Sequence, residues 1–352
     1  MSPPAVTLRD IAAVVGVSES TVSRVLRGEG KVSAQTRAKI LETADRLDFR
    51  PNALAQSLAR GQSQIIGIIV EDVSEIFSSI VLRGAESVFA GSDLATLVYD
   101  AQSSPDKRGE FIRKLQARHV DGVLVISRGP ADPYPSISDR FRVPVVYAFG
   151  RSTDASDLSF TPDDVAVGRL AGQHLIDSGR TRIAHITATE YGAQRRTEGL
   201  IEALTEAGLE IAGGAPMTGG WNARWGAAAT AELLERGVEF DAIFCGNDVI
   251  ALGAFARLHA AGRRVPEDVA IVGHDHFSRE RATEESRLLT TIDPNRAEIG
   301  ARAAAALVDA LKGAETPTGL QTVEASLVPG MSTASDPDEF DRATYELLEL
   351  LL

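Results

Sequence analysis

Polar side chains that could hold a hydroxyl-rich molecule come after short apolar runs in the C-terminal part of this 352-residue chain. Asn247 and Asp248 follow one run, Asp275 follows another, and Arg196 lies near the start of the helix expected after a third. Ligands of open parallel sheets lie outside the carboxyl ends of the strands, so we expect these side chains to share one site. Carboxylates, an amide and a guanidinium supply acceptors and donors of fixed direction for hydroxyl groups.

Each of these residues also has a simpler interpretation. Asp248 could cap the helix expected from Val249, because aspartate oxygens accept hydrogen bonds from free amides at helix starts. Arg196 could be a solvated helix residue, and Asp275 could belong to a turn. These alternatives remain open at the level of the sequence.

A second group of polar side chains, near the N-terminus, could contact DNA. Glu19, Ser20, Thr21, Ser23 and Arg24 fall on the face of a short predicted helix that its apolar residues leave exposed. Residues 1–64 carry nine Lys or Arg against six Asp or Glu, whereas the rest carries 27 against 43 and brings the net charge to −13. Contact with a polyanion should therefore be confined to the basic N-terminal part.

The spacing around this helix predicts a helix-turn-helix motif. Thr7 and Asp10 form a capping box for a first helix, and Gly16 permits the left-handed backbone of a tight turn. Ser18 then caps the second helix, which should end near Leu26. In this motif the second helix lies in the major groove and presents its N-terminal side chains to base edges. A small three-helix bundle that does not bind DNA would have the same spacing.

Two further elements are expected before residue 62. Ser33 should cap a third helix, in which Ile40, Leu41 and Ala44 close a small core. Residues 51–61 allow only about two helical turns, fewer than the roughly 12–15 residues that an isolated helix needs in water. This segment is therefore either a plain linker or a helix that folds on a partner.

From Ile65 onward, short apolar strands alternate with helices in two series. The expected strands cover residues 65–70, 95–99, 122–126 and 143–147, and then 182–187, 242–246 and 269–273. The expected helices cover residues 78–90, 107–117, 165–178, 193–207, 223–236 and 250–261, with a late helix over 296–312 that returns to the first series. The predicted fold class is α/β, with two parallel-sheet lobes and a ligand cleft between them.

Several motifs of the first sixty residues occur together: Val6-Thr-Leu-Arg-Asp-Ile-Ala, Gly16-Val-Ser, Thr21-Val-Ser-Arg-Val-Leu, Val32-Ser, Thr36-Arg and Phe49-Arg-Pro-Asn-Ala-Leu-Ala-Gln-Ser-Leu. As a set, which covers nearly every position from Val6 to Gly67, they closely resemble the head of the LacI–GalR family of transcriptional regulators. The resemblance implies phosphate contacts by Thr7, Ser18, Thr21 and Ser33, and base contacts by Glu19, Ser20 and Arg24. The full expected DNA-binding set is Thr7, Ser18, Glu19, Ser20, Thr21, Ser23, Arg24, Arg27, Lys31, Ser33, Asn52, Ala55 and Leu58.

The resemblance also assigns a role to residues 51–61. In the family this segment is a hinge helix that folds on DNA, pairs with its dimer mate and wedges a leucine into the minor groove. Here that leucine is Leu58, with Asn52 and Ala55 beside it. The implied partners are a second copy of the chain and double-stranded DNA with a palindromic operator.

The body carries motifs similar to those that flank the family's effector site: Arg196-x-x-Gly199, Cys245-Gly-Asn-Asp, Val272-Gly-His-Asp and Leu289-Thr-Thr-Ile. The effector-binding residues expected from them, with three aromatic additions, are Phe77, Phe149, Arg196, Trp221, Asn247, Asp248 and Asp275. Trp221 matches an aromatic that often packs against a sugar ring, but it could also be a core residue. The chain departs from the family at Glu75-Ile-Phe-Ser and Asp293-Pro-Asn, so the ligand's identity and its effect on DNA binding stay open.

Patterns of other functions are missing from the sequence. It has no G-x-S-x-G elbow, no phosphate-binding P-loop and no H-E-x-x-H pair, so we expect neither an enzyme nor a cofactor. His274 and His276 alternate around Asp275 in a loop, which rarely closes a metal site without further ligands, so we expect no metal. An exported solute-binding protein would have no use for residues 6–60. With no signal peptide or spanning segment, we expect a cytoplasmic, nucleoid-associated protein without a membrane partner.

The expected organisation is a DNA-binding domain (1–50), a hinge helix (51–61), a periplasmic-binding-protein-like effector and dimerisation domain (62–333) and a C-terminal tail (334–352). The tail has fewer than three heptads, which favours a homodimer over a tetramer. Together these features predict a repressor of metabolic, carbohydrate-related genes. Its allosteric effector would be a small hydroxyl-rich molecule such as a sugar, bound between the lobes.

Overall fold

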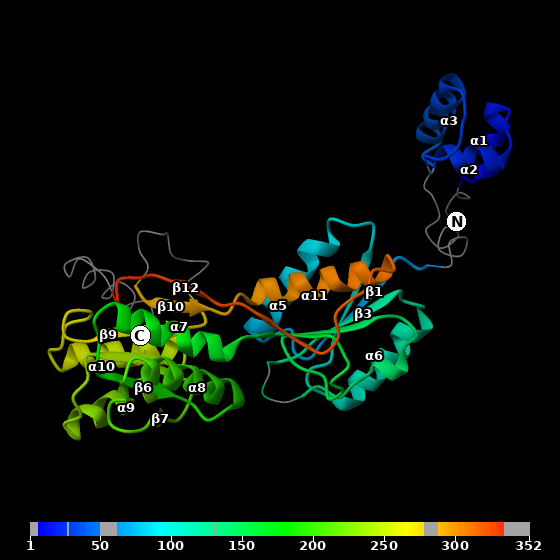
Figure 1. Cartoon of the computed structure of the whole chain (residues 1–352). Coiled ribbons are helices and arrows are strands. Elements are labelled where there is room, and N and C mark those ends of the chain that lie inside the picture. Colours follow the sequence, from blue (N-terminus) through cyan, green and yellow to red (C-terminus); the bar gives the residue numbers. More distant parts are fainter. Residues whose placement is uncertain are drawn as a thin grey trace. The chain divides into compact units, whose positions relative to one another are not determined.

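The computed structural model describes residues 6–26, 28–49, 62–129, 131, 133–277 and 288–333. The chain divides into two compact units, Met1–Ser63 and Gln64–Leu352 (Figure 1). We call the first unit the head and the second unit the body, and we describe each by itself.

Three helices form the head, and local signals in the sequence set their ends. They are α1 (Leu8–Val15), α2 (Glu19–Leu26) and α3 (Ala34–Arg46). Thr7 and Asp10 form the predicted capping box, in which the Thr7 amide donates to the Asp10 carboxylate at 2.8 Å. Gly16 adopts the predicted left-handed backbone, with φ of 81°. The helix-turn-helix geometry expected from the sequence is therefore confirmed.

The head core consists of seven buried side chains: Ile11, Ala12, Val15, Val22, Val25, Ile40 and Ala44. Leu41 was predicted to belong to this core, but it is 47% exposed, and Thr43 is buried instead. Neighbouring residues of an α-helix point about 100° apart, so Leu41 cannot share the inward face of Ile40, whereas residues three and four positions on can. The prediction for Leu41 was wrong.

The body contains two lobes, each built on a six-stranded sheet. The strand order of the first sheet is β11-β5-β4-β3-β1-β2, and these pairs are parallel. The strands are β1 (Ile65–Val70), β2 (Ala95–Asp100), β3 (Gly122–Ile126), β4 (Val145–Ala148), β5 (Ser159–Pro162) and β11 (Leu320–Val323). Helices α5 (Ile76–Phe89) and α11 (Arg296–Leu311) cover one face, and α6 (Pro105–Ala117) covers the other. A short 3-10 helix, η1, spans Ser138–Arg140.

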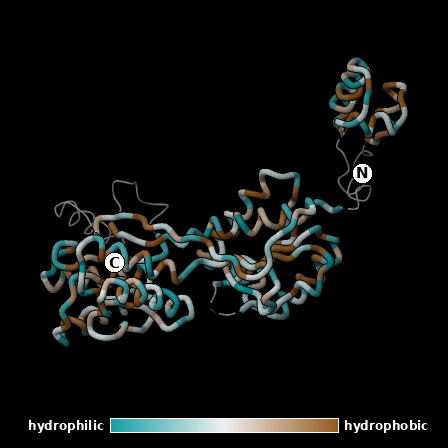
Figure 2. Tube along the Cα trace, in the orientation of Figure 1, coloured by the Kyte–Doolittle hydropathy of each residue, from teal (hydrophilic) through white to brown (hydrophobic). Residues whose placement is uncertain are grey.

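The second sheet has the order β12-β10-β9-β8-β6-β7. Its strands are β6 (Ile183–Thr187), β7 (Met217–Thr218), β8 (Ala242–Cys245), β9 (Ala270–His274), β10 (Thr290–Asp293) and β12 (Ser326–Val328), of which β12 runs antiparallel to β10. Helices α7 (Asp164–Asp177) and α8 (Tyr191–Glu206) cover one face, and α9 (Ala223–Glu235) and α10 (Asp248–Ala260) cover the other. Hydrophobic stretches of the chain occur inside both lobes (Figure 2). This arrangement confirms the predicted two-lobed α/β fold.

The chain passes between the lobes three times. The passages lie between β5 and α7, between β10 and α11, and between β11 and β12. As predicted, the late helix α11 returns to the first lobe, where it packs beside α5 (Figure 1). Each lobe is therefore made of two separate pieces of the chain.

Three helix pairs of the body cross at reciprocal glycines. A Cβ added at any of these glycines would lie 1.8–2.1 Å from a backbone oxygen of the other helix. The pairs are Gly84 and Gly300 in α5 and α11, Gly168 and Gly199 in α7 and α8, and Gly226 and Gly253 in α9 and α10. The two helices of each pair are thus in backbone contact, which any larger residue would prevent.

The sequence missed five short strands, β5, β7, β10, β11 and β12, which have two to four residues each. A run this short contains too few alternations to show a strand period. None of the helices within the described ranges is long and apolar enough to cross a membrane.

Candidate functional site

The exposed side of α2 carries the residues predicted to read bases. Glu19, Ser20 and Arg24 are exposed, and Thr21 and Ser23 are partly buried. The Arg24 Nε donates to the Ser20 carbonyl at 3.3 Å, which holds the guanidinium along the outer surface of the helix. This surface can therefore present hydrogen-bonding groups to a partner without any rearrangement of the helix.

The residues predicted to contact phosphates lie at helix starts. Thr7 and Ser33 are the N-caps of α1 and α3, and Ser18 accepts a hydrogen bond from the Thr21 amide at 3.2 Å. Free amides and the helix dipole favour an anion at such positions. Lys31 is exposed just before α3. Four residues of the predicted DNA-binding set, Arg27, Asn52, Ala55 and Leu58, lie outside the described residues.

A cavity of about 420 Å³ lies between the two lobes of the body. Residues of both lobes line it, including Phe77, Phe149, Arg196, Trp221, Asn247 and Asp275. Six of the seven residues predicted for the effector site therefore face one cavity, and Asp248 is the exception.

Arg196 is buried, so its interpretation as a solvated helix residue was wrong. Its Nη1 lies 2.5 Å from Asp164 Oδ1 at the start of α7, and both side chains are less than 10% exposed. The guanidinium carbon lies 5.5 Å from the centroid of the Trp221 ring. Trp221 is partly buried and also packs against the core of the second lobe, so it is both a cavity residue and a core residue.

Asp248 is not among the residues that line the cavity, and its predicted contact with the effector stays a prediction. The N-cap of α10 is Asn247, whose Oδ1 accepts from the Ile250 amide at 2.8 Å, so the alternative role of Asp248 as the helix cap was wrong. The Asp248 carboxylate accepts from Thr291 Oγ1 at 2.6 Å and from the Phe277 amide at 2.9 Å. Burial raises the pKa of Asp248 to about 7, although these two hydrogen bonds oppose the shift.

Asp275 lies at the end of β9 and is held by two side chains. His274 Nδ1 and Arg296 Nη2 lie 2.9 and 2.6 Å from its Oδ1. Burial would raise the pKa of Asp275, but His274 and Arg296 outweigh burial and hold the pKa of this carboxyl below its usual range. The backbone φ of Asp275 is 101°, a conformation that residues other than glycine adopt only when their surroundings enforce it. A plain turn residue would not need such support.

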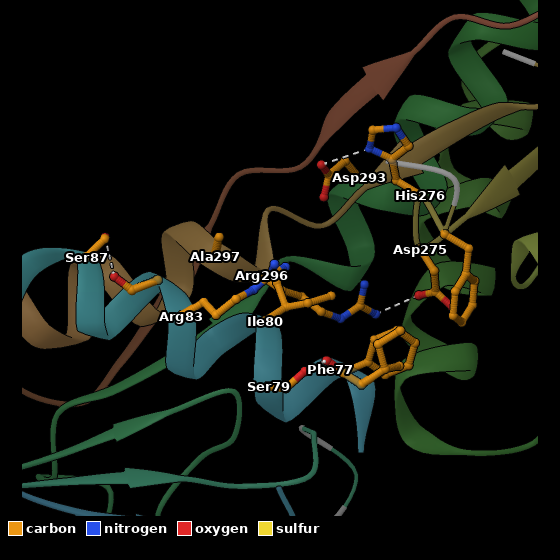
Figure 3. Close-up of a pocket in the computed structure, with 13 residues that line it drawn as sticks. Phe77, Ser79, Ile80, Arg83, Ser87, Asp275, His276, Asp293, Arg296 and Ala297 are labelled. Carbon is orange, nitrogen blue, oxygen red and sulfur yellow. Dashed lines mark hydrogen bonds and ion pairs between the residues drawn. The ribbon is translucent and has the colours of Figure 1, made fainter. Parts of the chain in front are cut away.

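Arg296 is the important cavity residue that the sequence did not identify. It is the first residue of α11 in the first lobe, is 7% exposed, and reaches Asp275 in the second lobe (Figure 3). Its guanidinium carbon lies 3.8 Å from the centroid of the Phe77 ring, which stacks against it. The predicted helix did begin at residue 296, next to a passage between the lobes. The position of residue 296 beside this passage could have indicated a role between the lobes. The sequence does not show, however, in which direction the side chain points.

A second cavity, of about 690 Å³, adjoins the first. Ser79, Ile80 and Arg83 of α5 line it, and it shares Phe77, Asp275, Phe277 and Arg296 with the first cavity (Figure 3). The stacked Phe77 and Arg296 side chains therefore belong to both cavities. In the part of the chain that the structure describes, no group of three or more His, Cys, Asp or Glu residues is placed to hold a metal.

Comparisons with known proteins identify the family of the chain. The model of bacterial regulatory proteins of the lacI family matches residues 7–52, and the periplasmic binding protein-like domain matches residues 173–333. The ribose operon repressor of Escherichia coli K12 is 32% identical over 326 residues, which are 92% of this chain and 97% of that protein. The chain belongs to the LacI family.

Other members of the LacI family support the same assignment over most of the chain. Catabolite control protein A of Priestia megaterium is 31% identical and covers 84% of this chain and 87% of its own length. The lac repressor dimer bound to operator and the anti-inducer ONPF has a TM-score of 0.72 at 27% identity, over 94% of this chain and all of that one. The CelR–cellobiose complex has a TM-score of 0.60 at 30% identity, over 93% and 99%. Each of these relatives aligns with at least 84% of this chain.

Proposed function

We propose that this protein is a sequence-specific DNA-binding repressor of carbohydrate-related genes, and that a small hydroxyl-rich effector in the cavity between the lobes controls its affinity for DNA. The observation that carries the proposal is the pairing of Arg196 with Asp164 beside Trp221 in that cavity, within a chain whose head belongs to a DNA-binding family. A ring with several hydroxyls can stack on an indole while its oxygens bond to fixed donors and acceptors.

The names of two relatives support a sugar as the effector. One is a ribose operon repressor, and another was solved in complex with cellobiose. Other relatives carry the name PurR, so a nucleobase-like ligand is the alternative class within the family. The polar pairs around the cavity favour the sugar, because they offer alternating donors and acceptors for hydroxyl groups.

The DNA partner is proposed to be a palindromic operator, bound by a homodimer in the cytoplasm. Each chain has one α2 helix, so two-fold symmetry would place two reading helices on two half-sites. In this proposal residues 51–61 are the switch, because they form the covalent route between head and body. Amide exchange over residues 52–60 should fall on operator binding and rise when the effector releases DNA. Exchange that is equally slow in all states would remove this role.

A gel-shift assay of the full-length protein with fragments of its own genome tests the function. We expect one or a few fragments to be retained at salt concentrations that release random DNA, and a sugar from a screened set to change this retention. Asp275→Ala should keep DNA retention and lose the response to the sugar, whereas Arg169→Ala, which removes exposed ion pairs between α7 and α8, should keep both. Failure to retain any fragment specifically would contradict the proposed repressor.

A further inference from the structure

The arginines that line the cavity between the lobes are all paired with carboxylates. Arg196 pairs with Asp164 at 2.5 Å, Arg296 with Asp275 at 2.6 Å, and Arg128 with Glu75 at 3.3 Å. Each arginine in the described lining therefore has a carboxylate partner that also lines the cavity.

The described lining carries one more negative group than positive groups. Glu190 adds a fourth carboxylate to the three arginine pairs, so the Asp and Glu side chains of the lining outnumber its arginines. An anionic ligand would lose its hydration on entering the cavity. It would also meet carboxylates, while the arginines of the lining are already paired with carboxylates of the protein. The lining thus opposes a phosphate or a carboxylate on the ligand.

Two of these arginines, Arg196 and Arg296, each keep one donor without a partner among the described residues. The Nε atoms of Arg196 and Arg296 are buried and have no hydrogen-bond partner among the described residues, and both residues are 7% exposed. A hydroxyl oxygen can accept from such a donor without adding charge, whereas a buried donor that stays unpaired costs about 1–3 kcal/mol.

Among the three arginines, Arg296 has the strongest influence on the charge balance of the cavity lining. Phe77 stacks on its guanidinium at 3.8 Å (Figure 3), and the Phe149 ring centroid lies 5.6 Å from the guanidinium carbon, so two aromatic rings lie next to the group. It comes from the first lobe and neutralises a carboxylate of the second. Without Arg296, the buried carboxylate of Asp275 would lose its arginine partner and keep only His274, whose Nδ1 lies 2.9 Å away.

We propose that the effector is an uncharged polyhydroxyl compound, and that the Arg296–Asp275 pair excludes sugar acids and sugar phosphates from the cavity. This inference rests on the proposed function, because it specifies the class of effector for the same cavity. Arg296 is a specificity-determining residue in this view: it donates to a ligand hydroxyl through Nε and cancels the charge of Asp275 through Nη2.

Calorimetric titration of the full-length protein with matched ligands tests the inference. The probes are D-glucose with D-glucuronate and D-glucose 6-phosphate, D-galactose with D-galacturonate, and D-ribose with D-ribose 5-phosphate. In every set in which binding occurs, we expect the neutral sugar to bind at least about tenfold more tightly than its anionic counterparts, a difference of about 1.4 kcal/mol.

Two variants then test the role of the pair itself. Asp275→Asn leaves Arg296 unmatched and should shift the ratio of neutral to uronate affinity at least about tenfold toward the uronate. Arg296→Gln leaves Asp275 unmatched and should shift the ratio the other way. Arg169→Gln, on the exposed surface of α7, is the matched control and should leave the ratio unchanged. The ratio is measured on folded protein only, so a loss of stability does not imitate either shift.

The possible failures are distinguishable. Tighter binding of a uronate or a phosphate by the parent protein would overturn the inference while supporting a sugar-responsive regulator. An unchanged ratio in both pair variants would also overturn it, because the pair would then not set the charge preference. Absence of binding by every probe, together with normal operator binding, would contradict the sugar class of the effector and this inference with it.

Discussion

The head and the body hold their functional side chains in opposite surroundings. In the head, Ser18 and Arg24 are exposed, and each bonds to a residue only three or four positions away. In the body, Arg196 and Arg296 are 7% exposed and pair with carboxylates that are 32 and 21 positions away. One helix is enough to present a surface to a rigid polymer, whereas a buried site for a small molecule needs distant segments to be brought together.

This contrast implies that the two regions fail in different ways. A change at the surface of the head should weaken binding without affecting folding, because the local helix remains. A change in the packing of the body should lower the stability of the lobes and thereby distort the cavity that they form.

The largest effect is expected from Ile40→Ala in the head core. Ile40 is fully buried among only seven core residues, and a large-to-small change of this kind costs about 2–5 kcal/mol. Since small domains have little stability to lose, DNA binding should disappear while the thermal transition of the body stays in place. Circular dichroism and calorimetry measure both. Leu41→Ala, one position on and 47% exposed, should change stability by less than about 0.5 kcal/mol.

A smaller loss, of about 1–3 kcal/mol, is expected from Gly300→Ala in the body. The added Cβ would lie 1.9 Å from the Val81 carbonyl oxygen, so α5 and α11 must separate. Urea unfolding measures the loss. Gly109→Ala, in α6, is the matched control because its Cβ would meet nothing nearer than 3.7 Å, and the better helix propensity of alanine should make it neutral or stabilising. Equal effects of the two changes would show that helix contact at Gly300 is not what limits stability.

On DNA, Arg24→Ala should cost about 1–3 kcal/mol of specific affinity and relax the base preference at one position. Arg24 is exposed on α2 and no core residue depends on it, so the melting curve should not move. Fluorescence anisotropy with operator and random duplexes provides the measurement. Lys39→Ala, an exposed change on α3, should weaken both duplexes slightly and equally. The same uniform loss for Arg24→Ala would reassign Arg24 to a phosphate.

The smallest effect concerns pH and the buried Asp248. Its pKa is about 7 in the folded chain and about 4 in an unfolded one, so between these values the folded state keeps a proton that the unfolded state has lost. Raising the pH through this range must therefore weaken the folded state. Asp248→Asn removes this loss, and its stability relative to the parent should rise by about 1 kcal/mol between pH 6 and pH 7.

Asp268 provides the opposite sign as a control for the pH experiment. Hydrogen bonds from Arg264 hold the pKa of Asp268 at about 2, so its contribution is present above about pH 4 and is lost as the pH falls toward 2. Asp268→Asn should leave the change in stability between pH 6 and pH 7 as it is in the parent. A parent protein whose stability is flat from pH 4 to 7 would show that Asp248 titrates normally.

The sequence predicted the head well because its determinants are local. The capping box at Thr7, the turn at Gly16 and the cap at Ser33 each involve residues within a few positions of one another. The prediction for Leu41 was wrong because it placed this residue on the buried face of its helix. The outline of the body was also predictable, because its longer strands have continuous apolar runs with helices between them.

The cavity was predictable only in part. Strand ends identified Asn247 and Asp275, but not the direction of Asp248, whose side chain turns toward Phe277 and Thr291 behind the cavity. Arg296 was not predicted because its role depends on contact between the two lobes. No sequence pattern within one segment indicates which residues of the other lobe it contacts. The family motifs do not include it either.

The three passages of the chain between the lobes have a consequence for how such proteins can change during evolution. The first lobe needs α11 and β11 as well as the segment from β1 to β5, so no single cut of the gene separates the lobes. Recombination with a relative at one crossover point within the body would join, in at least one lobe, segments that were never selected together. The head, by contrast, is one continuous stretch that ends before Gln64. A single exchange of gene segments at this boundary can thus combine an intact head with an intact body from a relative, whereas a single exchange within the body cannot keep both lobes intact.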